Sequence, residues 1–286
     1  MIKSYYYLAK PGIIYGNLIT AAAGFLLASQ TNVDWYLFLA LLGGTALVIG
    51  SACAFNNYID RGVDSKMART KKRALVSGNI HPRAALVYAS VLGIAGFLCL
   101  LVFTNTLATI VELVAFIFYV IIYGWAKRNT SFSTLIGTIP GAAPPVAGYV
   151  AVTNNFDGGA LILFFILVFW QLPHFYGIAL YRFKDYKAAG LPVMSVSKGF
   201  LSTKIQTLVY ILAFMVTVAA LWYFNYAGYT YLIVVELLAL AWLVKGIQGF
   251  DNQKTANWGK KIFLFSLIVN VGMSVMIGAN SWLVKL

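Results

Sequence analysis

The chain has 286 residues, of which 61% are hydrophobic and 10% charged, and its mean hydropathy is +0.81. Because so little polar surface cannot cover a water-soluble globule, the composition excludes a soluble protein and indicates an integral membrane protein. The formal net charge of +13 does not indicate nucleic-acid binding, because the bases follow the ends of apolar segments instead of forming one soluble basic face.

Apolar segments of the length that crosses ~30 Å of hydrocarbon recur along the whole chain. The alternating segments of about ten residues that are typical of a membrane β-barrel are absent from the sequence. We therefore predict an all-α, polytopic membrane protein that forms a single domain over residues 1–286, with nine spans around a central chamber open to the cytoplasmic side. The predicted spans are 12–29, 36–57, 84–103, 107–125, 132–152, 160–180, 205–224, 229–249 and 262–283.

The distribution of basic residues predicts the orientation of these spans. If the connections alternate between the two sides of the membrane, every Lys and Arg except Lys285 lies on the side of the N-terminus. Cytoplasmic connections carry such an excess of bases. We expect a multi-pass protein of the cell membrane, the inner membrane in a bacterium, in contact with membrane lipid, with a cytoplasmic N-terminus and a C-terminus outside.

Three polar residues follow the second predicted span at helical spacing. Asn56, Asp60 and Asp64 are four residues apart, so they share one helix face with neighbouring Cβ atoms roughly 6 Å apart. Two carboxylates at this separation repel by about 3 kcal/mol at an effective dielectric constant of about 20, so a positive partner is expected. Arg61 and Lys66 would supply it if this is only a solvated helix end.

The alternative positive partner is Mg²⁺, because carboxylate and amide oxygens suit this ion, which proteins often share with substrate phosphates. Bases that follow the acids would then bind the remaining oxygens of a diphosphate. These bases are Lys66, Arg69, Lys71, Lys72 and Arg73.

The stretch NNYIDRGVDSKMARTKKR, residues 56–73, resembles the first aspartate-rich motif of the UbiA superfamily of intramembrane prenyltransferases, N-D-x-x-D-x-x-x-D. Asn56, Asp60 and Asp64 match this motif, and the resemblance implies that they bind Mg²⁺. Asn57 stands where the family usually has Asp.

This departure, together with the bases after it, is similar to the protohaem farnesyltransferase branch of the superfamily. Further blocks resemble the same branch in the same order, and together they cover nearly the full chain. They are AKPGIIYGNLITAAAGFLLAS at 9–29, GTIPGAAPPVAGY at 137–149, WQLPHFYGIALYRFKDYKAAGLPV at 170–193 and WGKKIFLFS at 258–266.

The second acidic motif of the superfamily, D-x-x-x-D, has a reduced counterpart after the sixth predicted span. Here the sequence is YRFKD, with Tyr181 in place of the first acid and Asp185 four residues later. The resemblance implies that Asp185 is a further metal ligand. Arg182 and Lys184 are candidates for diphosphate contacts, although cytoplasmic charge explains them equally well.

Other polar residues near or within the spans are candidates for substrate contacts. Lys127 and Arg128 precede the fifth span and could reach a diphosphate, or could only mark the cytoplasmic side. His174 shares a helix face with Tyr181 and Asp185 if the helix continues, and it is either a structural hydrogen-bonding group or a ligand or orienting group for haem. Glu112 and Glu236, inside the fourth and eighth spans, are predicted to form hydrogen bonds between helices.

The activity implied by the resemblance is Mg²⁺-dependent transfer of a farnesyl group from farnesyl diphosphate to a vinyl group of haem b, followed by addition of water. An aromatic quinone precursor is the alternative acceptor, and a membrane transporter is the alternative class of protein. A downstream haem-modifying enzyme or a terminal oxidase assembly is an expected docking partner.

Overall fold

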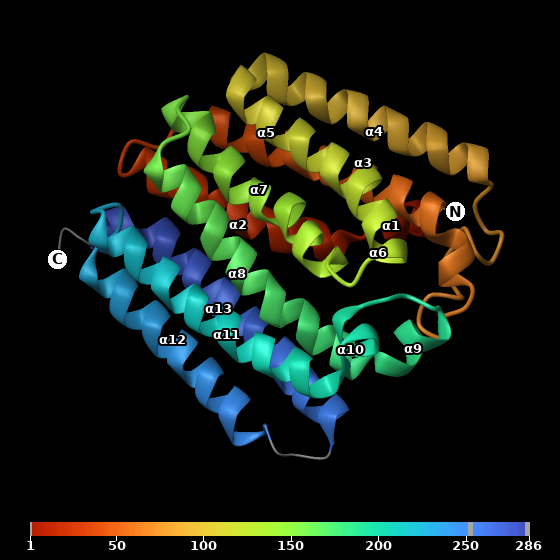
Figure 1. Ribbon diagram of the computed structural model, residues 1–286. Helices are drawn as coiled ribbons and strands as arrows, with labels where there is room; N and C mark the ends of the chain where they lie inside the picture. Colours follow the sequence, from red (N-terminus) through yellow and green to blue (C-terminus); the bar gives the residue numbers. More distant parts are fainter. Residues whose placement is uncertain (1, 251–253, 284–286) are drawn as a thin grey trace.

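The computed structural model describes residues 2–250 and 254–283, and in this part of the chain all regular secondary structure is helical, without a strand (Figure 1). Within it nine helices are long and apolar enough to cross a membrane, which confirms the predicted all-α fold. They are α2 (Pro11–Ser29), α3 (Trp35–Asp64), α4 (Pro82–Phe103), the α5–η1–α6 segment (Thr106–Asn129), α7 (Ser133–Thr153), α8 (Gly158–Tyr181), α11 (Gly199–Tyr223), α12 (Tyr229–Gln248) and α13 (Thr255–Leu283). Lys285 lies outside the described residues.

Four of these helices form the centre of the molecule. Helices α2, α7, α8 and α13 each pack against two others of the four, so they close a ring. Helices α3 and α5 pack on one side of the ring, α11 and α12 pack on the other, and α4 covers α3 (Figure 1). Large apolar side chains such as Val91 in α4, Val216 in α11 and Leu237 in α12 are exposed, as expected for surfaces that face lipid.

Three short helices lie at the end of the bundle that also holds the N-terminus (Figure 1). They are α1 (Ile2–Leu8), α9 (Phe183–Ala188) and α10 (Met194–Ser197). The same end receives α3, whose 30 residues make it about 45 Å long, longer than the ~30 Å hydrocarbon layer. The last turns of α3 therefore extend beyond its apolar segment and carry the acidic motif.

The fourth span differs from the uniform helix expected from its hydropathy. It consists of α5 (Thr106–Ile117), a π-helical turn η1 (Phe118–Ile122) and α6 (Tyr123–Asn129). Such turns are rare and usually occur near functional sites. Tyr119 from this turn and Tyr123 just after it stack at 5.7 Å between ring centroids.

Helices α8 and α13 approach each other closely at a pair of glycines. A Cβ atom on Gly259 would lie 2.6 Å from the carbonyl oxygen of Gly177, and one on Gly177 would lie 2.9 Å from that of Gly259. Small residues allow this kind of backbone contact between membrane helices. The contact sets the separation of two helices that form one wall of the site described next.

Candidate active site

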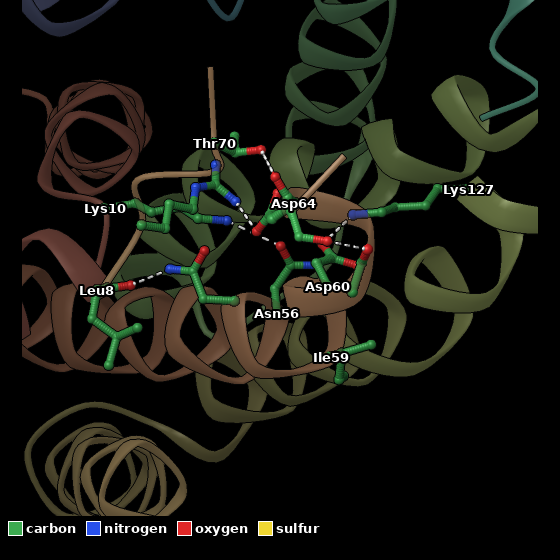
Figure 2. Close-up of polar contacts among 12 residues, drawn as sticks. Leu8, Lys10, Asn56, Ile59, Asp60, Asp64, Thr70 and Lys127 are labelled. Atoms are coloured by element: carbon green, nitrogen blue, oxygen red, sulfur yellow. Dashed lines mark hydrogen bonds and ion pairs between the residues drawn. The ribbon is translucent and has the colours of Figure 1, made fainter. Parts of the chain in front are cut away.

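The acidic motif of α3 lines a cavity of about 470 Å³ inside the bundle. Asn56, Asp60 and Asp64 lie on one face of α3, as their spacing predicted, and each is buried. Figure 2 shows the three side chains between Lys10 on one side and Lys127 on the other. Residues from α2, α3, α5, η1, α6, α7, α8, α9 and α13 contribute to the lining, whereas α4, α11 and α12 contribute none of the described lining residues.

The two carboxylates have basic partners that come from other parts of the chain. Asp60 forms ion pairs with Lys127 and with Arg128, whose Nη2 lies 3.2 Å from Oδ1 of Asp60. Arg73 Nη1 lies 2.6 Å from Oδ2 of Asp64. Both buried carboxylates at this end of the cavity are therefore paired with bases, and pairing lowers the cost of burying their charge.

The sequence analysis considered Arg61 and Lys66 as positive partners of the two carboxylates, and in the structure neither forms an ion pair with them. Arg61 instead lies over the ring of Tyr58, 4.2 Å from its centroid, and donates to the carbonyl oxygen of Tyr58. Lys66 is exposed and is absent from the cavity lining. The charges of Asp60 and Asp64 are therefore balanced by residues brought in by folding, and not by the neighbouring bases of α3.

Lys10 is a site residue that the sequence analysis treated only as a marker of the cytoplasmic side. Its Nζ donates to Oδ1 of Asn56 at 3.0 Å, and it lines the cavity (Figure 2). Burial lowers the pKa of the Lys10 ammonium to about 8. Asn57 holds this segment in place, because its Nδ2 donates to the carbonyl oxygen of Leu8 at 2.8 Å, and Asn57 itself is not part of the lining.

The bases after α3 divide into two groups. Arg69 and Arg73 line the cavity. Thr70 fixes the turn that carries them, since its hydroxyl donates to the carbonyl oxygen of Asp64 at 2.9 Å. Lys71 is exposed and lies outside the lining, as Lys66 does.

The second predicted cluster, around YRFKD, does not lie on one continuous helix. Helix α8 ends at Tyr181, and Arg182 separates it from α9, so His174, Tyr181 and Asp185 do not share the face of one helix. The guanidinium of Arg182 lies 4.3 Å from the ring centroid of Tyr181. Neither residue is among the cavity residues, and the same holds for Lys184 and Asp185.

The connection after α8 nevertheless reaches the cavity through a residue that the motif did not indicate. Tyr186 lines it, one position after Asp185, and burial raises the pKa of the Tyr186 phenol. Leu191 and Val193 of the same connection also line the cavity and pack with Val63 of α3. The two predicted motifs are thus adjacent, although Asp185 itself does not face the described cavity.

Deeper parts of the cavity carry isolated polar groups on apolar walls. His174 lines the wall formed by α8, and its Nδ1 lies 2.7 Å from the hydroxyl of Ser266 in α13. On another wall, the hydroxyl of Thr45 donates to Oε1 of Glu112 at 3.1 Å. This bond joins α3 to α5 and confirms the hydrogen bond between helices that was predicted for Glu112, whereas no hydrogen bond to another described residue is found for Glu236 in α12.

The donor atoms fit a magnesium diphosphate. Asp60 and Asp64 offer hard carboxylate oxygens, and a third oxygen comes from the amide of Asn56. The buried Nδ2 of Asn56 has no hydrogen-bond partner, so it can donate to an oxygen of a bound ligand. The described part of the chain contains no cluster of three or more His, Cys, Asp or Glu side chains that could hold a metal ion by itself. A metal at this site would therefore share its coordination with the bound diphosphate.

Comparison with known proteins gives matches along nearly the whole chain. Residues 17–268 match the model of the UbiA prenyltransferase family. The protoheme IX farnesyltransferase of Edwardsiella ictaluri (strain 93-146) is 50% identical over 281 residues, which cover 98% of this chain and 95% of that protein. The Yersinia pseudotuberculosis (serotype O:1b) protein of the same name has the same identity and coverage.

Solved structures with low sequence identity share the fold. A UbiA homolog from Archaeoglobus fulgidus, bound to GPP and Mg²⁺, aligns with a TM-score of 0.73 and 17% identity, covering 96% of this chain and 99% of that one.

Proposed function

Because the chain belongs to the UbiA prenyltransferase family, we propose that it transfers the farnesyl group of farnesyl diphosphate to a vinyl group of haem b, with addition of water. The names of its relatives at 50% identity support this choice of donor and acceptor. The observation that carries the proposal is the buried acidic motif, ringed by bases, at one end of a membrane cavity. The reaction depends on Mg²⁺.

The charged end of the cavity binds the diphosphate. Asn56, Asp60 and Asp64 would hold Mg²⁺, which when bound would neutralise negative charge on the leaving diphosphate. Support for this metal comes from the oxygen donors of this chain and from the Archaeoglobus fulgidus homolog, which binds Mg²⁺ with GPP. Asp185 contributes to the metal site only if its connection moves toward the cavity on binding.

Basic side chains bind the phosphate oxygens that the metal leaves free. Lys10, Arg69, Arg73 and Lys127 all line the cavity beside the acidic motif. Lys10, Arg73 and Lys127 are already held by hydrogen bonds to the motif, and donors fixed in this way stabilise the growing negative charge on the diphosphate. Arg128 supports them from outside the lining through its ion pair with Asp60.

The apolar part of the cavity holds the farnesyl chain and the acceptor. Residues such as Val48, Phe116 and Leu167 offer no nucleophile that would trap an allylic cation before the vinyl carbon reacts. The vinyl group attacks the allylic carbon, and water then adds to the new cation and releases a proton. His174, a polar residue on the α8 wall, orients the porphyrin.

A turnover assay with the purified, detergent-solubilised protein tests the proposal. Haem b, farnesyl diphosphate and Mg²⁺ are supplied, 4-hydroxybenzoate serves as a parallel acceptor, and products are identified by mass. The expected product is haem with one added farnesyl group and one water, and it disappears when Mg²⁺ is chelated. If 4-hydroxybenzoate is prenylated and haem is unchanged, the acceptor is an aromatic compound and not haem. If neither is prenylated, the proposal of a prenyltransferase of this kind is refuted.

A further inference from the structure

Two aromatic residues of α8 contact one serine of α13. Trp170 Nε1 donates to the backbone carbonyl oxygen of Ser266 at 2.9 Å, and one helical turn later His174 Nδ1 lies 2.7 Å from the hydroxyl oxygen of the same serine. Ser266 is fully buried and His174 lines the cavity. The serine therefore sits behind the histidine, on the side away from the cavity.

The hydrogen bonds of Ser266 determine which nitrogen of His174 carries the proton. A serine hydroxyl has a single hydrogen, and Ser266 donates it to the carbonyl oxygen of Phe263 at 2.6 Å. The hydroxyl oxygen then accepts from His174, so Nδ1 carries the proton. In a neutral imidazole this leaves Nε2 as an unprotonated acceptor.

The ring of His174 is also fixed in orientation by its neighbours. Trp170 stacks on it, with 4.8 Å between centroids and 30° between planes, and Phe263 packs at 5.1 Å. Among the described residues none forms a hydrogen bond with Nε2. A ring held through Nδ1–H with a free Nε2 is the arrangement in which histidine binds metals, because the second hydrogen bond fixes the tautomer and raises the basicity of the ligand.

We propose that Ser266 is a positioning residue that holds His174 as the Nδ1–H tautomer and so directs its Nε2 to the iron of the haem acceptor. The inference rests on the proposed function, since it assigns one wall of the cavity to haem. The Gly177–Gly259 contact brings α8 and α13 close enough for this pairing. Ser266 itself touches neither the iron nor the vinyl group.

The test compares Ser266→Ala with Ser274→Ala. Ser274 lies on the same helix, is buried, has no hydrogen-bond partner for its hydroxyl and does not line the cavity. Each purified variant is titrated with haemin, followed by the Soret band, and separately with metal-free protoporphyrin IX, followed by fluorescence. Ser266→Ala should weaken haemin binding by about 10- to 100-fold, the usual effect of losing a hydrogen bond to a metal ligand. Its affinity for protoporphyrin IX should not change, and Ser274→Ala should bind both as the wild type does.

Vibrational spectroscopy of the ferrous haem complex gives a second readout. The iron–histidine stretching band should be present in the wild type, shifted to lower frequency in Ser266→Ala and absent in His174→Ala. An equal loss of both porphyrins in Ser266→Ala would indicate damage to the fold and overturn the inference, and so would an unchanged stretching band. If the wild type farnesylates haem but the band is missing, the inference fails and the proposed function stands; if the wild type neither binds nor modifies haem, both fail.

Discussion

Replacing Lys10 by Met tests whether the base that folding adds to the acidic motif binds the diphosphate. Met keeps most of the length of the side chain and removes its charge. A hydrogen bond to a charged group contributes about 1.5–3 kcal/mol, so the affinity for a farnesyl diphosphate analogue should fall by about 10- to 150-fold. The substitution also leaves Oδ1 of Asn56, now 3.0 Å from the Lys10 ammonium, without a donor, so a lower melting temperature is expected as well.

The assay is calorimetric titration of the purified protein with farnesyl thiodiphosphate in the presence of Mg²⁺. Lys3→Met is the matched control, because Lys3 is an exposed base of α1 and lies outside the cavity lining. It removes the same charge from the same segment and should change the affinity by less than about twofold, as surface substitutions usually do. Equal effects of the two variants would mean that Lys10 acts only through net charge, and a change of less than twofold in Lys10→Met would refute its contact with the diphosphate.

The remaining predictions concern the metal, the acceptor and the helix contact. Asp60→Ala and Asp64→Ala should each lower turnover by at least ~100-fold while the protein remains folded and inserted, and wild-type activity in either purified variant would exclude the metal assignment. His174→Ala should weaken haem binding more than farnesyl diphosphate binding, measured by separate titrations; an equal loss would argue against a haem-facing side chain. Gly259→Ala should destabilise the protein by about 1–3 kcal/mol in thermal unfolding, because the new Cβ atom would lie 2.6 Å from a backbone oxygen. In Gly272→Ala the new Cβ atom would contact only the end of the Leu238 side chain, so the free energy of unfolding should fall by less than in Gly259→Ala.

The sequence was sufficient to predict features that depend on local periodicity. Hydropathy located the nine spans because each is a long apolar run, and the spacing of Asn56, Asp60 and Asp64 placed them on one face of α3. Both inferences use only the geometry of a single helix. The burial of these residues and the identity of their partners were not available from that geometry.

Features that arise from packing between helices could not be predicted in this way. Lys10 was indistinguishable from any other base before a first span, because only the contact of α1 and α2 with α3 brings it to Asn56. The family motif pointed to Asp185 and not to Tyr186, although Tyr186 is the one that lines the cavity. Which of the two faces inward depends on the end of α8 at Tyr181, which the motif does not indicate. The hydrogen bond between His174 and Ser266 joins residues 92 positions apart.

The π-helical turn of the fourth span holds one residue more than an α-helical turn between two contacts with α3. Before the turn, Glu112 accepts from Thr45, and after it Lys127 pairs with Asp60. Deletion of Ile121 would let this turn close with the i→i+4 hydrogen bonds of an α-helix, so both contacts would be kept, whereas a deletion within a regular α-helix rotates everything beyond it by about 100°. Ile121 itself is exposed and can accept other apolar side chains. This turn therefore tolerates changes of residue type and the loss of one residue, and deletion scanning would find a permissive position here in a span that is otherwise sensitive to length.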